Sequence, residues 1–118
     1  MIHEVDVIIP TYKRSNMLER TVNSVLEQTY KNVKVIVVDD NDPNTKWRKK
    51  TTEVMRKFCN DDRVKYICHE KNKNGSAARN TGLKYTSGEF VCFLDDDDFF
   101  LKEKVELLHS QFLNLKFF

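Results

Sequence analysis

Short apolar runs alternate along this chain with segments whose apolar side chains recur at helical spacing. The runs cover residues 5–9, 33–38, 64–68 and 90–94, and they are rich in β-branched and aromatic residues, which is typical of buried strands. A helical pattern follows each run. The order β-α-β-α-β-α-β-α therefore predicts an α/β fold, a Rossmann-like parallel sheet of about four strands with helices on both faces.

The helical segments are expected over residues 18–26, 47–58, 75–86 and 101–113. Ser15 or Asn16 is expected to cap the first helix, because small polar side chains accept hydrogen bonds from free N–H groups there. Pro10 is expected to stop the first strand, and Gly88 lies just past the third helix, where glycine often ends a helix.

The composition fits a single domain over residues 1–118, with 40% apolar and 32% charged residues. The formal charge of +2 is too small to attract nucleic acid, so we expect no nucleic-acid partner. The sequence contains no apolar run long enough for a transmembrane helix, and its first ten residues lack the features of a signal peptide. Three cysteines without a C-x-x-C pair predict reduced thiols and a cytoplasmic location.

The most polar segments follow the predicted strands. They are residues 10–14, 39–44, the stretch after Cys68, and residues 95–98. Ligands of open parallel sheets bind beyond the carboxyl ends of the strands. We therefore expect these loops to form the functional site.

Four consecutive aspartates, Asp95 to Asp98, follow the fourth strand directly. Adjacent carboxylates repel each other by about 4 kcal/mol per pair at ~4 Å in a protein-like dielectric, so water, raised pKa values or a cation must relieve them. Mg²⁺ and Mn²⁺ bind one or two carboxylates together with substrate phosphates. Asp95 and Asp97 would point the same way on an extended backbone. The alternative is a solvated acidic turn in which Asp98 caps the next helix.

Each of the other loops has a functional and a structural interpretation. Asp39 and Asp40 can accept hydrogen bonds from a nucleobase or ribose, or form an Asx turn leading to Pro43. Tyr12 can stack on a base or lie on the surface. Arg14 can contact a phosphate or remain solvated.

The third helix opens with small residues at 74–78, which allow its N-terminus to approach an anion or the sheet closely. Arg79 can bind a diphosphate with two parallel hydrogen bonds, or form a surface ion pair. The segment is not a P-loop, because the G-K-[ST] element is missing. The basic run 46–50 is expected to be the wet side of a helix anchored by a buried Trp47, with a membrane-surface role as the alternative.

Five motifs occur in order over nearly the whole chain. They are V-I-I-P-T-Y-K-R at 7–14, S-V-L-E-Q-T-Y at 24–30, V-V-D-D at 37–40, N-G-S-A-A-R-N-T-G at 74–82 and G-E-F-V-C-F-L-D-D-D-D at 88–98. Together they resemble the family-2 inverting glycosyltransferases with the GT-A fold.

The resemblance implies a binding site for a nucleotide-sugar donor, with a UDP-sugar favoured. Asp96 would contact the ribose, and Asp97 with Asp95 would bind Mn²⁺ or Mg²⁺ to neutralise the departing diphosphate. The sugar would pass with inversion to a hydroxyl of a saccharide or lipid-linked acceptor, in cell-surface polysaccharide synthesis near the membrane. The implied donor-binding residues are Pro10, Thr11, Tyr12, Arg14, Asp39, Asp40, Arg79, Asp95 and Asp96.

The chain is shorter than members of that family, whose later half carries the acceptor platform and the catalytic base. No acidic residue follows Glu106, so no general base can be placed. We expect a truncated, N-terminal donor-binding part whose apolar ending, 112–118, packs on itself or on a second copy in a homodimer. The alternative is a non-catalytic nucleotide-sugar-binding fragment. A phospho-receiver domain would place paired acids after the first strand, where this chain has Pro-Thr-Tyr.

Overall fold

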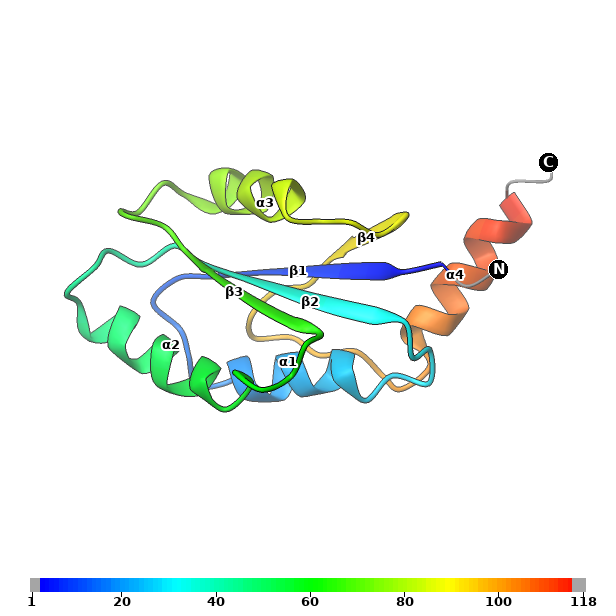
Figure 1. The fold of residues 1–118 in the computed structure, drawn as a ribbon, viewed down its shortest axis with the longest axis horizontal. Helices are drawn as coiled ribbons and strands as arrows, with labels where there is room; N and C mark the ends of the chain where they lie inside the picture. Colours follow the sequence, from blue (N-terminus) through cyan, green and yellow to red (C-terminus); the bar gives the residue numbers. More distant parts are fainter. Residues whose placement is uncertain (1–2, 116–118) are drawn as a thin grey trace.

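The computed structural model describes residues 3–115 and consists of one parallel sheet with helices on both faces (Figure 1). The strands lie in the order β3-β2-β1-β4, and they are β1 (Val5–Thr11), β2 (Val33–Asp39), β3 (Val64–Cys68) and β4 (Phe90–Phe93). The helices are α1 (Leu18–Leu26), α2 (Lys46–Arg56), α3 (Gly75–Lys84) and α4 (Lys104–Leu115). The predicted α/β fold is confirmed.

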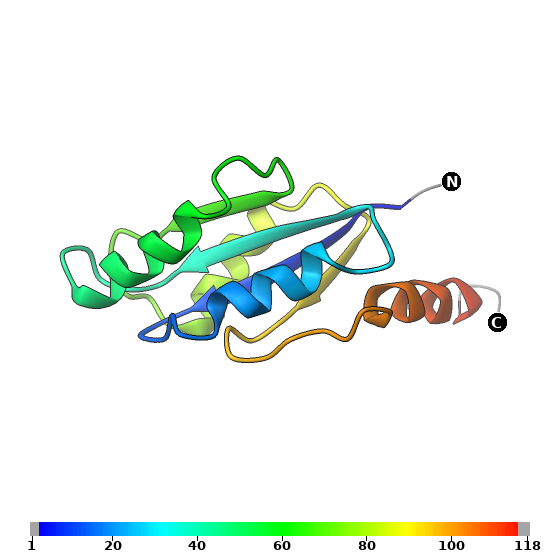
Figure 2. The same ribbon diagram turned by 90° about the horizontal axis from the view of Figure 1, so that it is seen from below.

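The two faces of the sheet form two apolar layers, because side chains alternate along a strand. Val7 and Ile9 pack toward α1 and α2, which lie side by side beneath the sheet (Figure 2). Ile8 and Ile36 face the opposite way and pack against Ala78 of α3. The described helices include none that is long and apolar enough to span a bilayer.

The carboxyl ends of β1, β2 and β3 are level, because Thr11 pairs with Asp39 and Asp39 pairs with Cys68. The loops that follow these strands therefore meet at one edge of the sheet, at the left of Figure 1. α4 lies at the opposite edge, near the start of β1 (Figure 1).

Pro10 does not stop β1, contrary to the sequence-based expectation. β4 pairs with β1 only as far as Ile8, opposite Phe93, so no neighbour on that side requires an N–H from Pro10. The strand continues beside β2 to Thr11.

Two expected helix ends are also wrong. The N-cap of α1 is Met17, whose side chain makes no capping bond, and the backbone N–H of Leu18 donates to the carbonyl of Ser15 at 3.3 Å. Gly88 does not end α3, since Tyr85 is the C-cap. Gly88 instead permits a close approach, because a Cβ there would lie 2.6 Å from the carbonyl oxygen of Glu4.

The apolar ending of the chain lies partly on α4. Phe112 packs edge-on against Phe90, with ring centroids 4.7 Å apart, although it remains half exposed. This contact agrees with the expectation that the ending folds back on its own chain. Residues 116–118 lie outside the described residues, and the homodimer stays a prediction.

Gly82 lets α3 pack closely on β1, and its replacement by alanine should destabilise the fold. A Cβ at Gly82 would lie 2.5 Å from Ile8 Cγ2, so the helix would have to move. We expect Gly82→Ala to lower the free energy of unfolding by about 1–3 kcal/mol, although alanine favours a helix by about 1 kcal/mol. Gly75→Ala is the control, because its Cβ would meet only the flexible end of Arg79, at 3.3 Å. Equal stability of the two variants in urea titrations would contradict this packing.

Asp6 is a buried carboxylate that organises the connection from α3 to β4. Its Oδ2 accepts hydrogen bonds from the N–H groups of Ser87 and Gly88, both at 2.8 Å, while its Oδ1 has no partner among the described residues. Burial raises the pKa of Asp6 above its ordinary value of 3.8, and the neighbouring Glu4 adds to the rise.

The raised pKa predicts how stability depends on pH. The folded chain holds the Asp6 proton more tightly than the unfolded chain does. The resulting stabilisation is therefore complete below about pH 3.8 and is lost as the pH rises through the folded-state pKa. Asp6→Asn cannot ionise. We expect the stability of the wild type relative to Asp6→Asn to fall over this pH range in chemical denaturation. A difference that stays constant or grows with pH would refute the assignment.

Candidate functional site

A cleft of about 560 Å³ opens where the loops after the strands meet. It is lined by Pro10, Thr11, Tyr12, Lys13, Arg14, Asp40, Asn72, Asn74, Gly75, Arg79, Asp95 and Asp96. Eight of the nine residues predicted to bind the donor are among them, and the exception is Asp39. A hollow of about 650 Å³ along α1 contains none of the predicted residues.

Asp96 is one of two buried acidic residues that line this cleft, with 2% of its surface exposed, and the other is Asp40. Its Oδ2 accepts a hydrogen bond from the Thr11 hydroxyl at 2.8 Å. Arg14 Nη2 lies 2.7 Å from Oδ1 as an ion pair, but no described residue gives that oxygen a well-oriented hydrogen bond. Burial raises the pKa of Asp96, and the donors around it only partly oppose the rise. Asp96 thus lines the cleft with a carboxylate whose hydrogen-bonding capacity the described residues do not fill.

The aspartate tetrad forms a turn and not the extended backbone that we considered. The N–H of Asp98 donates to the carbonyl of Asp95 at 3.1 Å, and the Thr21 hydroxyl of α1 lies 2.5 Å from the Asp98 carbonyl. Asp98 does not cap a helix, because its Oδ1 accepts from the adjacent N–H of Phe99 and α4 begins only at Lys104. Asp95 and Asp97 are exposed on either side of the buried Asp96.

The donor set of this turn fits a hard divalent cation in part. Within residues 3–115 no three acidic, histidine or cysteine side chains are arranged to hold a metal ion. Two exposed carboxylates, Asp95 and Asp97, are nevertheless the number that Mg²⁺ or Mn²⁺ commonly takes from a protein when phosphate oxygens complete the shell. Arg14 Nη1 lies 3.2 Å from Asp97 Oδ2 and balances its charge.

Positive groups at the start of α3 also line the cleft. The N-terminus of α3 lies there, and Asn74 caps it by accepting a hydrogen bond from the N–H of Ala77 at 2.9 Å. The guanidinium of Arg79 lies over the start of this helix, beside Gly75. A helix N-terminus carries about half a positive charge. This side of the cleft therefore favours an anionic ligand.

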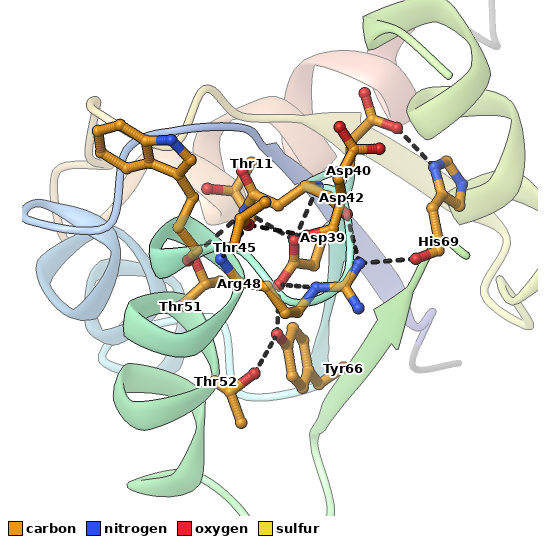
Figure 3. Close-up of polar contacts among 12 residues, drawn as sticks. Thr11, Asp39, Asp40, Asp42, Thr45, Arg48, Thr51, Thr52, Tyr66 and His69 are labelled. Carbon is orange, nitrogen blue, oxygen red and sulfur yellow. Dashed lines mark hydrogen bonds and ion pairs between the residues drawn. The ribbon is translucent and has the colours of Figure 1, made fainter. Parts of the chain in front are cut away.

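Asp39 does not line the cleft, although it was predicted to bind the donor. Its carboxylate is fully buried and is surrounded by groups of the chain itself (Figure 3). Oδ1 accepts from the N–H of Asn41 at 3.0 Å, which is the Asx turn named as the alternative, and from Asn41 Nδ2 at 2.8 Å. Oδ2 accepts from the Tyr66 hydroxyl and pairs with Arg48 Nε at 3.1 Å. Burial and Asp39 raise the pKa of Tyr66, so its hydroxyl keeps the proton.

The basic run on α2 is only partly the wet face that its sequence predicts. Lys46 and Lys50 are exposed, with their ammonium groups 4.6 and 5.8 Å from the ring centre of Trp47. Trp47 is half-buried and thus only in part the buried anchor that was expected. Arg48 turns inward, where its Nη2 also donates to the carbonyl oxygens of Asn41 and His69, each at 2.6 Å.

Asp40 lines the cleft, but its carboxylate is also fully engaged. Oδ1 lies 2.7 Å from His69 Nδ1 and accepts from the N–H of Lys73 at 2.8 Å. Oδ2 accepts from Asn72 Nδ2 at 2.8 Å and from the N–H of Asn74 at 3.0 Å. Asp40 therefore shapes the loop that forms one wall of the cleft.

Sequence reasoning missed the residues that hold this pair of aspartates, chiefly Arg48, Tyr66 and His69. Arg48 lies inside a run of basic residues, and Tyr66 lies inside an apolar strand. Neither position differs from its neighbours in a way that predicts a hydrogen bond. His69 directly follows a strand, which was the single signal available for it.

Removing Arg48 should leave the buried Asp39 carboxylate short of a positive partner. We expect Arg48→Met to lower the free energy of unfolding by about 3–5 kcal/mol, because an uncompensated buried charge is costly. Lys49→Met, at the adjacent exposed position, should change stability by no more than about 0.5 kcal/mol. Guanidinium denaturation of both variants makes the comparison, and similar effects would argue against the Arg48–Asp39 assignment.

Comparison with known proteins places this geometry in a family. The family model described as Glycosyl transferase family 2 matches residues 6–116 of this chain. The UDP-Glc:alpha-D-GlcNAc-diphosphoundecaprenol beta-1,3-glucosyltransferase WfgD of Escherichia coli is 38% identical over 109 residues, which are 92% of this chain and 41% of that protein.

Solved structures agree with the sequence comparison. Staphylococcus aureus TarS 1-349 in complex with UDP-GlcNAc superposes with a TM-score of 0.78 at 31% identity, over 91% of this chain and 30% of that chain. The mannosyltransferase PcManGT of Pyrobaculum calidifontis, in complex with GDP-Man and Mn²⁺, gives 0.71 at 25% identity over 83% and 28%. This chain thus spans less than half the length of each of the three proteins, and it belongs to glycosyltransferase family 2, with the GT-A type of fold.

Proposed function

We propose that this chain forms the donor-binding part of an inverting glycosyltransferase that transfers a sugar from a UDP-sugar to an acceptor hydroxyl. The observation that carries the proposal is the buried Asp96 carboxylate, which lines a cleft that the N-terminus of α3 and Arg79 also line. A nucleoside diphosphate has hydroxyl donors at one end and phosphates at the other, so it complements both the carboxylate and the positive groups.

The nucleoside would occupy the side of the cleft formed by the β1 loop. Tyr12 is 40% exposed, so its ring can stack on a base. Asp96 Oδ1 lacks a well-oriented donor, so a ribose hydroxyl can supply one. Pro10 and Thr11 complete this wall beside the base. The UDP-GlcNAc bound to TarS supports uracil as the base. PcManGT binds GDP-Man, so GDP is the nucleotide to compare with UDP in experiments.

The diphosphate would occupy the side formed by α3. Arg79 can bind phosphate oxygens with two parallel hydrogen bonds, and Gly75 leaves room for a close approach. Asp97 and Asp95 would hold Mn²⁺ or Mg²⁺, in line with the Mn²⁺ bound by PcManGT. When bound, the cation would neutralise the charge on the departing diphosphate as a Lewis acid.

The acceptor is proposed to be a saccharide or a lipid-linked saccharide. WfgD, whose name specifies a diphosphoundecaprenol-linked acceptor, supports this choice. We propose that the protein acts in cell-surface polysaccharide synthesis, on the cytoplasmic side close to a membrane. Inverting transfer needs a general base to take the acceptor proton, and we assign none among the residues of this chain. A fragment that binds the donor without transferring sugar is the alternative, and detection of transfer to any acceptor would eliminate it.

Calorimetric titration with UDP, with and without Mn²⁺, tests the proposal. We expect UDP to bind more tightly with Mn²⁺, and Asp97→Ala to weaken the Mn²⁺-dependent binding at least about tenfold, which is about 1.4 kcal/mol. Asp62→Ala removes another exposed carboxylate, on the connection before β3, and it should bind as the wild type does. GDP is the comparison nucleotide. Folded protein that binds neither nucleotide would refute the proposal.

A further inference from the structure

We propose that His69 is a positioning residue for nucleotide binding, acting through Asp40 on the cleft wall formed by residues 72–75. The inference rests on the proposed function, because it concerns the same cleft. His69 itself does not line the cleft. Its effect on a ligand would be carried entirely by the groups that it holds.

His69 joins three elements of the fold at one buried point. It directly follows β3, and 5% of its surface is exposed. Nδ1 lies 2.7 Å from Asp40 Oδ1, at the end of β2 (Figure 3), and Nε2 lies 2.7 Å from Thr81 Oγ1 in α3. Because a carboxylate only accepts hydrogen bonds, Nδ1 carries a proton and donates it. The Thr81 hydroxyl can donate or accept, so it is a suitable hydrogen-bond partner for the second ring nitrogen, Nε2.

The Asp40 carboxylate links His69 to the loop that contains Asn72, Lys73 and Asn74. Its four hydrogen-bond partners, His69 included, fill the acceptor positions that a carboxylate offers. Three of them belong to Asn72, Lys73 and Asn74, which are consecutive. If the carboxylate lost the bond to His69, it could rotate and release these partners.

Asn74 shows why the loop needs such a hold. Its φ is 96°, a region that residues with a side chain rarely adopt. In this conformation its side chain caps α3 through the N–H of Ala77, which fixes the start of the helix at the cleft. The chain His69–Asp40–Asn74 thus sets where the positive end of α3 lies.

The experiment compares His69→Leu with His69→Asn in the full chain. Leucine fills most of the buried volume but donates no hydrogen bond. Asparagine can place its amide nitrogen near the position of Nδ1 and donate to Asp40. We expect His69→Leu to weaken UDP binding at least about tenfold, the effect of one charge-assisted hydrogen bond, and His69→Asn to recover most of the affinity. Thr81→Val, which removes only the hydroxyl, should give an intermediate loss.

Amide hydrogen exchange without nucleotide gives a second readout. We expect His69→Leu to speed exchange at Lys73 and Asn74, whose N–H groups donate to Asp40, and His69→Asn to restore their protection. His109→Leu is the matched control, because His109 lies in α4 at the opposite end of the sheet (Figure 1), pairs with His3 at 2.9 Å and does not line the cleft. It should change neither UDP affinity nor exchange at these two amides.

The outcomes separate the two proposals. A folded His69→Leu that binds UDP as the wild type does and retains protection at Lys73 and Asn74 overturns the role of His69. If that variant does not fold, the other two variants decide. The role of His69 is equally overturned if Thr81→Val has wild-type UDP affinity and amide protection while His69→Asn retains neither. If the wild type binds no UDP while His69→Leu still speeds exchange at both amides, the proposed function fails and the positioning of the loop stands.

Discussion

The rest of the site depends on two buried carboxylates, Asp39 and Asp40, at the end of the central strand β2. Neighbouring charges removed from water are costly unless each is matched by donors. Four groups surround each carboxylate, and none of them comes from a ligand. The pair is therefore a structural centre from which the loops of the cleft are held.

The two aspartates hold different loops of the cleft. Asp39 fixes Asn41, whose Oδ1 accepts from the N–H of Lys13 at 2.8 Å, in the loop after β1. Asp40 holds the N–H of Asn74 in the loop before α3. Lys13 and Asn74 both have positive φ, at 54° and 96°. Each unfavourable backbone conformation thus lies beside the cleft and is tied to one member of the pair.

Sequence patterns predicted the sheet and the place of the site, but not the partners of its charged groups. The hydrophobic period predicted β3 at its observed ends, although no residue of this edge strand is fully buried. The parallel register that sets Phe93 opposite Ile8 brings Asp96 beside Thr11 and Arg14. The hydrophobic period of a sequence does not indicate which side chains form hydrogen bonds. It could not distinguish Arg48 from the lysines beside it or show that Asp39 is enclosed. The prediction that Pro10 stops β1 was wrong, because a strand tolerates proline where no neighbouring strand needs its N–H. That condition depends on how far β4 extends, which only the tertiary structure determines.

Asp96 differs physically from Asp39 and Asp40, although all three are buried aspartates that follow strands. Its burial outweighs its donors, so its pKa is raised, and one buried oxygen of this cleft-lining carboxylate has no well-oriented hydrogen bond from the described residues. A ligand that donates a hydrogen bond there would relieve the desolvation that the fold leaves uncompensated. The site thus keeps two carboxylates fully bonded to hold its shape. It leaves a third partly bonded, and under the proposed function that difference separates the scaffold from the group that contacts the nucleotide.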